Sequence, residues 1–378
     1  MKEDLILAVN SGSSSLKFGL FAHRGDDESP LYQGEAENIG RPDSRLSITD
    51  AAQKSVLDEP CASTSQTAAL KSILDALAKC GAPTPAAVGH RVVHGGPHLR
   101  QHQRITPAVI QTLESATHFA PLHIPASLAL IRQTETLLPQ AQQFACFDTA
   151  FHATMPETST RYPLPAEFYR EGVQRYGFHG LSYESILHRL GNNLPPRVVC
   201  AHLGSGASLA AIRDGRSIDT SMGLTPTGGI PMSTRTGDLD PGILIFLLRN
   251  NGLDADALET LLNRQSGLAA LSGGESDMRR LQAAMESGDK NAALAINIFT
   301  TAIRKFIGAY AAELGGLDLL IFTGGIGQHS GFVRNLVCQG LEFLGIRPGE
   351  EGPNTKVLAL PSDEETQIAR HARHLMNP

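Results

Sequence analysis

Three glycine-rich segments, each directly after an apolar run, most limit the folds open to this chain. They are VNSGSSSLKFGLF at 9–21, AHLGSGASLAAIRDG at 201–215 and FTGGIGQHSG at 322–331. Glycine lets backbone N–H groups approach an anion closely, because no Cβ stands in the way. Three such loops at strand ends predict a nucleotide whose phosphates and sugar are held between two lobes.

Two common phosphate-binding motifs do not fit these segments. No glycine is followed by lysine and serine or threonine as in the Walker pattern. The dinucleotide fingerprint G-x-G-x-x-G fails because Leu209 and Ser330 stand where its last glycine belongs. One such segment alone would indicate only a strand-ending turn, whereas three in the same context favour a ligand.

The size and charge of the chain exclude several classes of function. Its 378 residues predict about two domains. A hydrophobic content of 41% with 19% charged residues is typical of a soluble globular protein. The net charge of −6 and the lack of tryptophan argue against a nucleic-acid partner. No uninterrupted apolar run approaches the roughly 20 residues that span a bilayer, so we expect no membrane partner.

The N-terminus and the cysteines indicate a cytoplasmic protein. Glu3 and Asp4 precede an immediate strand, which is not the pattern of a signal peptide. Five cysteines are an odd number and lack paired metal-ligand spacing. Cys146 and Cys200 lie inside apolar runs and are expected to be buried strand residues, as in a reducing compartment.

Hydrophobic periodicity and turn residues predict alternating strands and helices. The strands are expected at 5–9, 16–21, 86–93, 143–147, 197–202, 208–213 and 317–322, with a further strand after an Asp214–Gly215 turn. The helices are expected at 66–79, 106–117, 125–137, 241–249, 255–262, 276–287, 289–314 and 364–375.

The two halves of the chain resemble each other. SGSSSLKFGL and LGSGASLAAI both open with glycine and serine and reach a Ser-Leu pair that starts an outgoing strand. The copies lie about 190 residues apart, roughly one domain length. The fold class we predict is therefore α/β with a duplicated domain, although chance similarity between glycine- and serine-rich loops is the simpler alternative.

Four residues are candidates for chemistry on anions. Arg91 in GHRVVHGG and Arg235 in MSTRTGDLDPG lie beside glycines, and a guanidinium suits carboxylate and phosphate alike. The alternative for each arginine is an internal salt bridge, for Arg235 with Asp238 or Asp240. Asp148 ends a strand, where ligands of open α/β sheets gather, or it caps the next segment. His179 in RYGFHGLS is the fourth candidate, or a structural hydrogen-bond partner.

A tightly bound metal is not indicated by the other histidines. There are 14 histidines, and His90, His94, His123 and His202 also lie in glycine- or proline-rich segments without a ranking among them. No H-E-x-x-H motif or Cys/His cluster is present. Weakly held Mg²⁺ remains open, since it needs only one or two carboxylates with phosphates and water.

Eight motifs in order give the chain a family resemblance. VNSGSSSLKF, GHRVVHGG, FDTAFH, RYGFHG, HLGSG, STRTGDLDPG, TGGIG and DEE…IAR run from Val9 to Arg370. Together they resemble the acetokinase family, within the superfamily of acetate and sugar kinases, Hsp70 and actin. The resemblance implies two lobes with ribonuclease-H-like cores, a nucleotide in the cleft between them, and a homodimer. It also implies an N-terminal lobe of 1–149 plus 365–378, and a nucleotide-binding, dimer-forming lobe of 150–364.

The resemblance implies roles for residues that match the motifs. Asp148, His179 and Arg235 match catalytic residues, and Arg91 with Arg235 would hold the acyl carboxylate and the transferring phosphoryl group. The acyl methyl pocket matches Val93, Leu122, Phe178 and Pro226. Asn10 and Glu364 match Mg²⁺-linked positions, with Mn²⁺ as a substitute ion. The positions that match contacts to ATP or ADP are Lys17, His202, Leu203, Gly204, Ser205, Gly206, Asp277, Met278, Arg279, Gly324, Gly325, Ile326, Gly327 and Gln328.

Four positions depart from the family pattern. Ser205 and Ile124 stand where asparagine is usual, Gln328 where glutamate is usual, and Ser233 where glycine is usual. Because the arginines and the aspartate match, the reaction implied is phosphoryl transfer from MgATP to a short carboxylate. The changes leave the nucleotide preference and acyl-chain length open.

Three other functions remain open at this stage. Propionate is the nearest alternative acceptor, since one methylene changes binding in an apolar pocket by only about 1–3 kcal/mol. An ATPase of the actin or Hsp70 kind would lack a small acceptor, which Arg91 and the apolar pocket residues argue against. A regulator without catalysis is disfavoured by the matches at Asp148 and Arg235.

Overall fold

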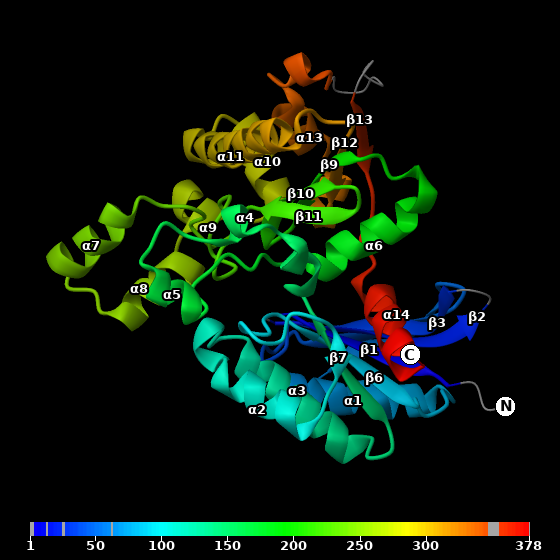
Figure 1. Ribbon diagram of the computed structural model, residues 1–378. Coiled ribbons are helices and arrows are strands. Elements are labelled where there is room, and N and C mark those ends of the chain that lie inside the picture. Colours follow the sequence, from blue (N-terminus) through cyan, green and yellow to red (C-terminus); the bar gives the residue numbers. More distant parts are fainter. Residues whose placement is uncertain (1–3, 13, 25–26, 62, 347–354, 378) are drawn as a thin grey trace. The chain divides into compact units, whose positions relative to one another are not determined.

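The structure, a computed structural model, describes residues 4–12, 14–24, 27–61, 63–346 and 355–377. The chain divides into two compact units (Figure 1). The first unit comprises the chain up to Ala150 with Gly180–Ser185 and Asp363–Pro378, and the second comprises Phe151–His179 and Ile186–Ser362. Each unit contains one mixed β-sheet.

The first unit is built on a sheet with the order β5-β4-β3-β2-β1-β6-β8-β7. Strands β1 to β5 pair antiparallel in sequence, whereas β1, β6 and β8 run parallel. The strands are β1 (Ile6–Ser11), β2 (Leu16–Arg24), β3 (Asp27–Glu37), β4 (Arg45–Asp50), β5 (Ser55–Pro60), β6 (Ala87–Val92), β7 (Gln103–Arg104) and β8 (Gln142–Phe147). The helices are α1 (Gln66–Lys79), α2 (Pro107–Ser115), η1 (Thr117–Phe119), α3 (Ile124–Leu137) and α14 (Glu364–Met376).

Alternation along β1 builds two cores, one on each face of this sheet. Leu7 and Val9 pack in one buried cluster with residues of α1, and Ile6 and Ala8 pack in another with residues of α14. Successive side chains of a strand point to opposite faces, so a strand buried on both sides is apolar throughout. Figure 1 accordingly shows α1 on one face of the sheet and α14 (red) on the other.

Helix α1 has the bounds that its sequence predicts. Ser65 caps it by accepting a hydrogen bond from the Ala68 N–H, and buried residues recur at helical spacing from Ala69 to Leu77. Gly81 follows with φ +77°, a conformation that glycine adopts without a steric penalty.

The second unit is built on a sheet with the order β11-β10-β9-β12-β13. Its strands are β9 (Arg197–Leu203), β10 (Ala207–Arg213), β11 (Arg216–Thr220), β12 (Leu319–Thr323) and β13 (Lys356–Ala359). Its helices are α4 (Glu157–Thr160), α5 (Ala166–Arg170), η3 (Gly191–Asn193), α7 (Pro241–Asn250), α8 (Ala255–Arg264), α9 (Gly267–Ser272), α10 (Met278–Glu286), α11 (Lys290–Leu314), α12 (Gly324–His329), α13 (Gly331–Cys338) and η4 (Glu342–Leu344). Two further elements have residues in both units: η2 (Ala150–Thr154) and α6 (Gly180–Leu190).

Helix α11 is long and apolar enough to cross a membrane by length and composition alone. Its buried residues, among them Phe299, Ile303 and Ile307, belong to the core of the second unit, where the helix contacts β9 and β10. A core helix passes the same test, so this is weak evidence for a membrane span.

The two sheets share one strand order and one set of strand directions. In the first unit β3-β2-β1 are antiparallel neighbours, followed by β6 and β8 parallel to β1. In the second unit β11-β10-β9 are antiparallel neighbours, followed by β12 and β13 parallel to β9. The predicted α/β fold with a duplicated, ribonuclease-H-like core is confirmed.

The prediction of three loops of one kind is wrong for the third segment. The first two segments form turns between antiparallel strands, β1–β2 and β9–β10, although Ser13 of the first lies outside the described residues. In the third segment, however, Gly324 to His329 form helix α12 directly after β12. Tertiary packing overrides the low helix propensity of glycine here, since the first turn lies against the backbone of Leu203.

A glycine in β6 permits the close packing of α14, and its substitution tests this contact. A Cβ at Gly89 would lie 2.5 Å from Ile368 Cγ2 and 3.2 Å from the Ile368 carbonyl oxygen. We expect Gly89→Ala to lower the stability of the protein by about 1–3 kcal/mol, as overpacked cores do. The control is Gly308→Ala in α11, where a Cβ meets nothing within 4 Å, and which should be neutral or raise stability by about 0.5–1 kcal/mol. Urea midpoints measure both effects, and equal midpoints for the two variants would contradict the contact.

Candidate functional site

A buried ion pair lies where β6 and β8 end in the first unit. Arg91 Nε lies 3.1 and 3.0 Å from the two oxygens of Asp148, and Arg91 Nη2 donates to Asp148 Oδ2 at 2.6 Å. Arg91 Nη1 donates to the Ser11 carbonyl oxygen at 2.9 Å. These bonds use three of the five guanidinium N–H groups, one on Nε and one on each Nη. Among the described residues, one N–H on Nη1 and one on Nη2 are left for a ligand.

Three further carboxylate and amide side chains gather near this pair. Asn10, the fifth residue of β1, donates through Nδ2 to Glu364 Oε2 at 3.0 Å and to Glu365 Oε1 at 2.7 Å. Glu364 and Glu365 form the first turn of α14. Lys17 is the β2 residue directly opposite Asn10 and acts electrostatically on Glu365.

The charges of this cluster perturb one another. Burial raises the pKa of Glu365, and the neighbouring Glu364 raises it further, against the opposing effects of Lys17 and Asn10. Burial alone would lower the pKa of Arg91, but Asp148, Glu364 and Glu365 raise it above its ordinary value. The guanidinium is therefore charged. It faces three carboxylates, and this excess of negative charge suits an added cation.

His179 in the second unit has a backbone conformation that is rare for its residue type. Its φ is +60°, in the left-handed region, at the position preceding α6. A side chain other than glycine costs free energy there, and such outliers cluster at functional sites. Nδ1 of the ring lies 2.8 Å from Ser208 Oγ, and the ring stacks on His202 with centroids 4.3 Å apart.

The glycine turn between β9 and β10 brings His179 and Arg235 together. A Cβ placed on Gly206 would lie 3.2 Å from His179 Nε2 and 3.7 Å from Arg235 Nη1. Arg235 Nη1 also donates to the Pro226 carbonyl oxygen at 3.1 Å. Because Gly206 has no side chain, the imidazole and the guanidinium approach the same stretch of backbone.

Asp238 and Asp240, the alternative salt-bridge partners of Arg235, accept hydrogen bonds from backbone N–H groups. Asp238 Oδ1 accepts from the Gly229 N–H at 2.7 Å, and Asp240 caps α7 by accepting from Gly242 at 2.7 Å. Each carboxylate thus stabilises the loop or helix end beside it.

Two of the predicted nucleotide segments lie next to each other. A Cβ on Gly324 would lie 2.7 Å from the Leu203 carbonyl oxygen, so α12 begins against the β9 end of the 202–206 turn. Gly204 N–H donates to the Gly206 carbonyl oxygen at 3.0 Å and closes that turn. Arg334 holds the other end of α12 by donating to the carbonyl oxygens of Gly327 and Gln328.

The remaining predicted nucleotide segment, 277–279, lies in a different part of the second unit's hydrogen-bond network. Asp277 caps α10, accepting from the Arg279 N–H at 2.9 Å, and its pKa falls to about 2 chiefly because the Arg279 side chain donates to it. Met278 is buried. In the described part of the chain, no hydrogen bond or ion pair connects 277–279 with 202–206 or 324–328.

The four predicted pocket residues belong to different units. Val93 follows β6 and is buried, and Leu122, in the first unit too, is exposed. Phe178 and Pro226 are buried in the second unit. The pocket therefore stays a prediction.

Sequence reasoning missed several residues that the structure brings to these sites. Glu365 shares Asn10 with Glu364, and the repeated glutamate of the DEE run is the signal that could have found it. Ser208 belongs to the repeated Ser-Leu pair, which carries no sign of a hydrogen bond to His179. A cluster of His102, Glu184 and His371 was missed because its members are far apart in sequence.

Comparison with known proteins confirms the family resemblance. The model of the acetokinase family matches residues 5–370. Acetate kinase of Geobacillus kaustophilus (strain HTA426) is 42% identical over 396 residues, which cover 98% of this chain and 99% of the relative. Acetate kinase of Coprothermobacter proteolyticus is 43% identical and covers 97% of both chains.

Two solved structures are similar over the whole chain. The crystal structure of Porphyromonas gingivalis acetate kinase has a TM-score of 0.85 and 38% identity, covering 99% of this chain and 100% of that one. The crystal structure of a propionate kinase from Francisella tularensis has a TM-score of 0.90 and 33% identity, covering 98% and 100%.

Proposed function

The chain belongs to the acetokinase family, and on that basis we propose that it transfers a phosphoryl group reversibly from ATP to acetate, giving acetyl phosphate and ADP. The observation that carries the proposal is the Arg91 guanidinium, which a buried carboxylate fixes while, among the described residues, one N–H on each Nη is left for a ligand. The N–H donors of a guanidinium are groups that recognise carboxylate and phosphoryl oxygens.

In this reaction Asp148 orients Arg91 and does not act as a base. A short carboxylic acid has a pKa near 4 and is already ionised at neutral pH, so no proton has to be removed before attack. Arg91 then holds the acetate, and its contacts with Asp148 prevent the guanidinium from rotating. Alignment of the attacking oxygen is a large part of what phosphoryl transfer requires.

His179 and Arg235 supply charge stabilisation. In-line transfer spreads negative charge over the three equatorial oxygens of the phosphoryl group. Arg235 Nη1 and His179 Nε2 approach Gly206, the turn we propose to contact the nucleotide phosphates together with His202, Leu203, Gly204 and Ser205. Lys17, 277–279 and 324–328 complete the proposed nucleotide contacts.

The carboxylates beside Asn10 fit a divalent cation. Mg²⁺ prefers oxygen ligands, and Glu364 and Glu365 are adjacent acids whose mutual repulsion a cation would relieve. When bound with the nucleotide, Mg²⁺ neutralises developing charge on the phosphate oxygens. Asn10 orients both carboxylates through its amide N–H groups, and Mn²⁺ is the expected substitute.

A reducing compartment suits the cysteines. Cys61, Cys80, Cys146, Cys200 and Cys338 are free, and burial raises the thiol pKa of Cys146, Cys200 and Cys338. Cytoplasmic localisation is therefore the proposal that we retain.

Propionate is the second candidate acceptor, favoured by the similarity to a propionate kinase structure. The test is hydroxylamine trapping of acyl phosphate with ATP, Mg²⁺ and carboxylates of one to four carbons. We expect acetate to give the highest kcat/KM, with propionate within the roughly 10–200-fold range that one methylene allows. ATP hydrolysis that is indifferent to every carboxylate would establish the ATPase alternative instead.

The Arg91–Asp148 pair predicts a non-additive pair of substitutions. Arg91→Ala removes a charge-assisted contact and should lower kcat by about 10²–10³-fold. Asp148→Asn should also lower kcat strongly, but in the Arg91→Ala background it should add at most about twofold, because it acts through Arg91. The pH–rate profile of Asp148→Asn from pH 5 to 9 should keep the wild-type shape. An acidic limb of kcat that Asp148→Asn abolishes would show a general base and overturn this role.

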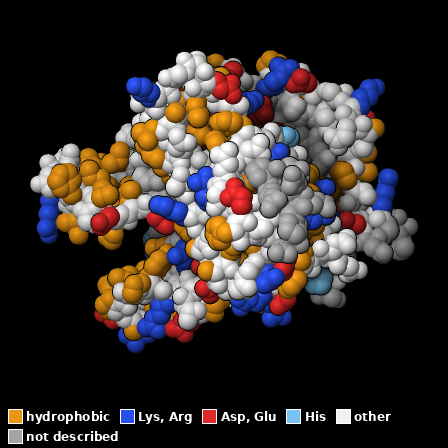
Figure 2. Space-filling view, turned by 90° about the horizontal axis from the view of Figure 1, so that it is seen from above, with side chains coloured by type: hydrophobic (Ala, Val, Ile, Leu, Met, Phe, Trp, Pro, Cys, Tyr) orange, Lys and Arg blue, Asp and Glu red, His pale blue; other side chains and the backbone are white. Residues whose placement is uncertain are grey.

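We also propose that the protein is a homodimer that uses α7, in the lobe of 150–364. Leu239, Ile243, Ile245, Phe246 and Leu248, here the α7 patch, are all at least 39% exposed. None of the α7 residues is buried. Figure 2 shows hydrophobic side chains gathered at the left of the view, over the part of the chain that carries α7 in Figure 1. Contiguous exposed apolar surface of this kind marks protein–protein contacts, and a second copy is the occupant we propose.

A matched pair of charge substitutions tests the α7 patch. Wild-type protein should elute with about twice the chain mass of 40.3 kDa, and Phe246→Glu should shift it toward the monomer. Phe343→Glu is the control, since Phe343 is even more exposed, at 77%, but lies outside the α7 patch. Light scattering after gel filtration measures the mass, and a monomeric wild type or an undisturbed Phe246→Glu dimer would contradict this interface.

A further inference from the structure

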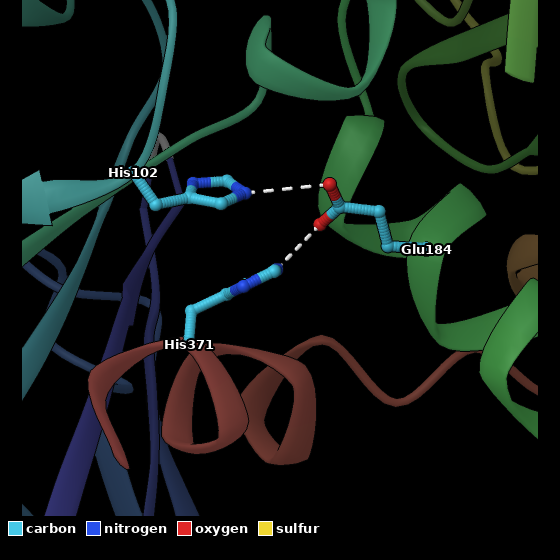
Figure 3. A group of neighbouring side chains, drawn as sticks. All are labelled: His102, Glu184 and His371. Atoms are coloured by element: carbon cyan, nitrogen blue, oxygen red, sulfur yellow. Dashed lines mark hydrogen bonds and ion pairs between the residues drawn. The ribbon is translucent and has the colours of Figure 1, made fainter. Parts of the chain in front are cut away.

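Three side chains from distant parts of the sequence converge within the first unit (Figure 3). His102 precedes β7, Glu184 lies in α6 and His371 lies in α14. His102 Nε2 lies 3.3 Å from Glu184 Oε1, and His371 Nε2 lies 2.7 Å from Glu184 Oε2. The two imidazole centroids are 3.8 Å apart. By distance alone, one ligand atom from each residue could surround a metal ion.

The hydrogen bond on the far side of His102 argues against that metal. The Phe147 N–H donates to His102 Nδ1 at 3.0 Å, so Nδ1 carries a lone pair and the single proton of the neutral ring lies on Nε2. A histidine that binds a metal through Nε2 instead donates its Nδ1–H to an acceptor. His102 therefore presents an N–H, not a lone pair, to the centre of the cluster.

Glu184 is the acceptor that this tautomer needs. Burial raises the pKa of Glu184, but hydrogen bonds from His102 and His371 outweigh burial and lower it to about 2. Burial lowers the pKa of His371 below its ordinary value, although Glu184 raises it. Glu184 in turn raises the pKa of the buried Cys146 thiol, and His374 lowers the pKa of His371. At neutral pH an ionised carboxylate thus accepts hydrogen bonds from both imidazoles.

The backbone that His102 holds is the one that carries Asp148. Phe147 is the residue before Asp148, and its N–H is bound to His102. The Asp148 N–H donates to the Val92 carbonyl oxygen at 3.1 Å, and the Asp148 carbonyl accepts from Gly180 at 2.9 Å. Gly180 and Glu184 lie one turn apart in α6. Helix α6 therefore restrains Asp148 directly through Gly180 and indirectly through Glu184 and His102.

We propose that Glu184 and His102 are positioning residues for phosphoryl transfer: Glu184 fixes the His102 tautomer, and His102 fixes the Phe147 N–H and thereby Asp148 and Arg91. The inference rests on the proposed function, since it concerns the placement of Arg91 in that reaction. A displacement of about 1 Å in a catalytic group can cost roughly 10²-fold in rate, so restraint of this backbone has a measurable effect.

Two substitutions of His102 separate its two hydrogen bonds. His102→Asn places an amide oxygen where Nδ1 lies, so it keeps an acceptor for the Phe147 N–H but does not reach Glu184. His102→Gln reaches Glu184 but offers no acceptor near the position of Nδ1. We expect His102→Asn to keep kcat within about 10-fold of wild type and His102→Gln to lose about 10–100-fold, with the KM values for acetate and ATP little changed. Equal kcat for both variants would overturn the proposal.

A double-substitution cycle tests whether Glu184 acts through Asp148. Glu184→Ala should lower kcat by about 10–100-fold alone, but by at most about twofold in the Asp148→Asn background. Additive losses would show that Glu184 acts by another route. The control is Asp27→Asn, which breaks the Arg370–Asp27 ion pair of α14, at 2.7 Å, without touching this cluster. Its kcat should match wild type, and a loss equal to that of Glu184→Ala would assign the effect to the docking of α14.

A measurement without catalysis keeps this proposal separate from the proposed function. In protein labelled with ¹⁵N-histidine, the His102 signals, identified by their loss in His102→Asn, should report the Nε2–H tautomer of the neutral ring. The Nδ1–H tautomer would overturn the proposal even in an active enzyme. Tight, stoichiometric binding of added Zn²⁺ that Glu184→Gln abolishes would also overturn it, in favour of a metal site. If the tautomer is as expected but no carboxylate is phosphorylated, the proposed function fails instead.

Discussion

The buried ion pair of Arg91 and Asp148 is the interaction on which the arrangement of the first unit's site depends. Asp148 is almost fully buried, and an unpaired carboxylate at such a position would be costly. Arg91 neutralises it, and the backbone around Asp148 is held by β6, by the start of α6 and by His102. Because both partners lie at the ends of parallel strands, the strand order of the sheet itself brings them together. The fold thus holds the Arg91 guanidinium in one orientation at the ends of two parallel strands.

Much of this architecture could be predicted from the sequence because it depends on local signals. The cap at Ser65 and the spacing from Ala69 to Leu77 define α1, and continuous apolar runs define β1, β8 and β12. The repeated glycine- and serine-rich turn predicted the duplication, which the shared strand order of the two sheets bears out. The placement of Arg91 and Asp148 at strand ends was predictable for the same reason, since the sequence identifies both strands.

Other features depend on contacts that no local pattern contains. Strands β4 and β5 lie at one end of the sheet and lack a continuous apolar run, because β4 buries only alternate residues, Leu46 and Ile48, and β5 is mostly exposed. Gly324 to His329 form a helix because, directly after β12, they pack against the backbone of Leu203. Glu184 and His371 are separated by 187 residues, so their hydrogen bond exists only once α6 and α14 are folded together.

Charge balance in the first unit's cluster supports the divalent cation that we propose there. Among the described residues of this cluster, Arg91 and Lys17 face Asp148, Glu364 and Glu365, so carboxylates outnumber basic groups. The raised pKa of Glu365 shows the direction of the imbalance, because burial and a neighbouring carboxylate both favour its protonated form. An incoming acetate or phosphate would add to this repulsion. A divalent ion held by the glutamates would relieve it, and in the function we propose this is how a chain with a net charge of −6 brings two anions together. We therefore infer that Mg²⁺ would assist binding of the acceptor as well as of the nucleotide, because Arg91 and Lys17 together do not offset three carboxylates.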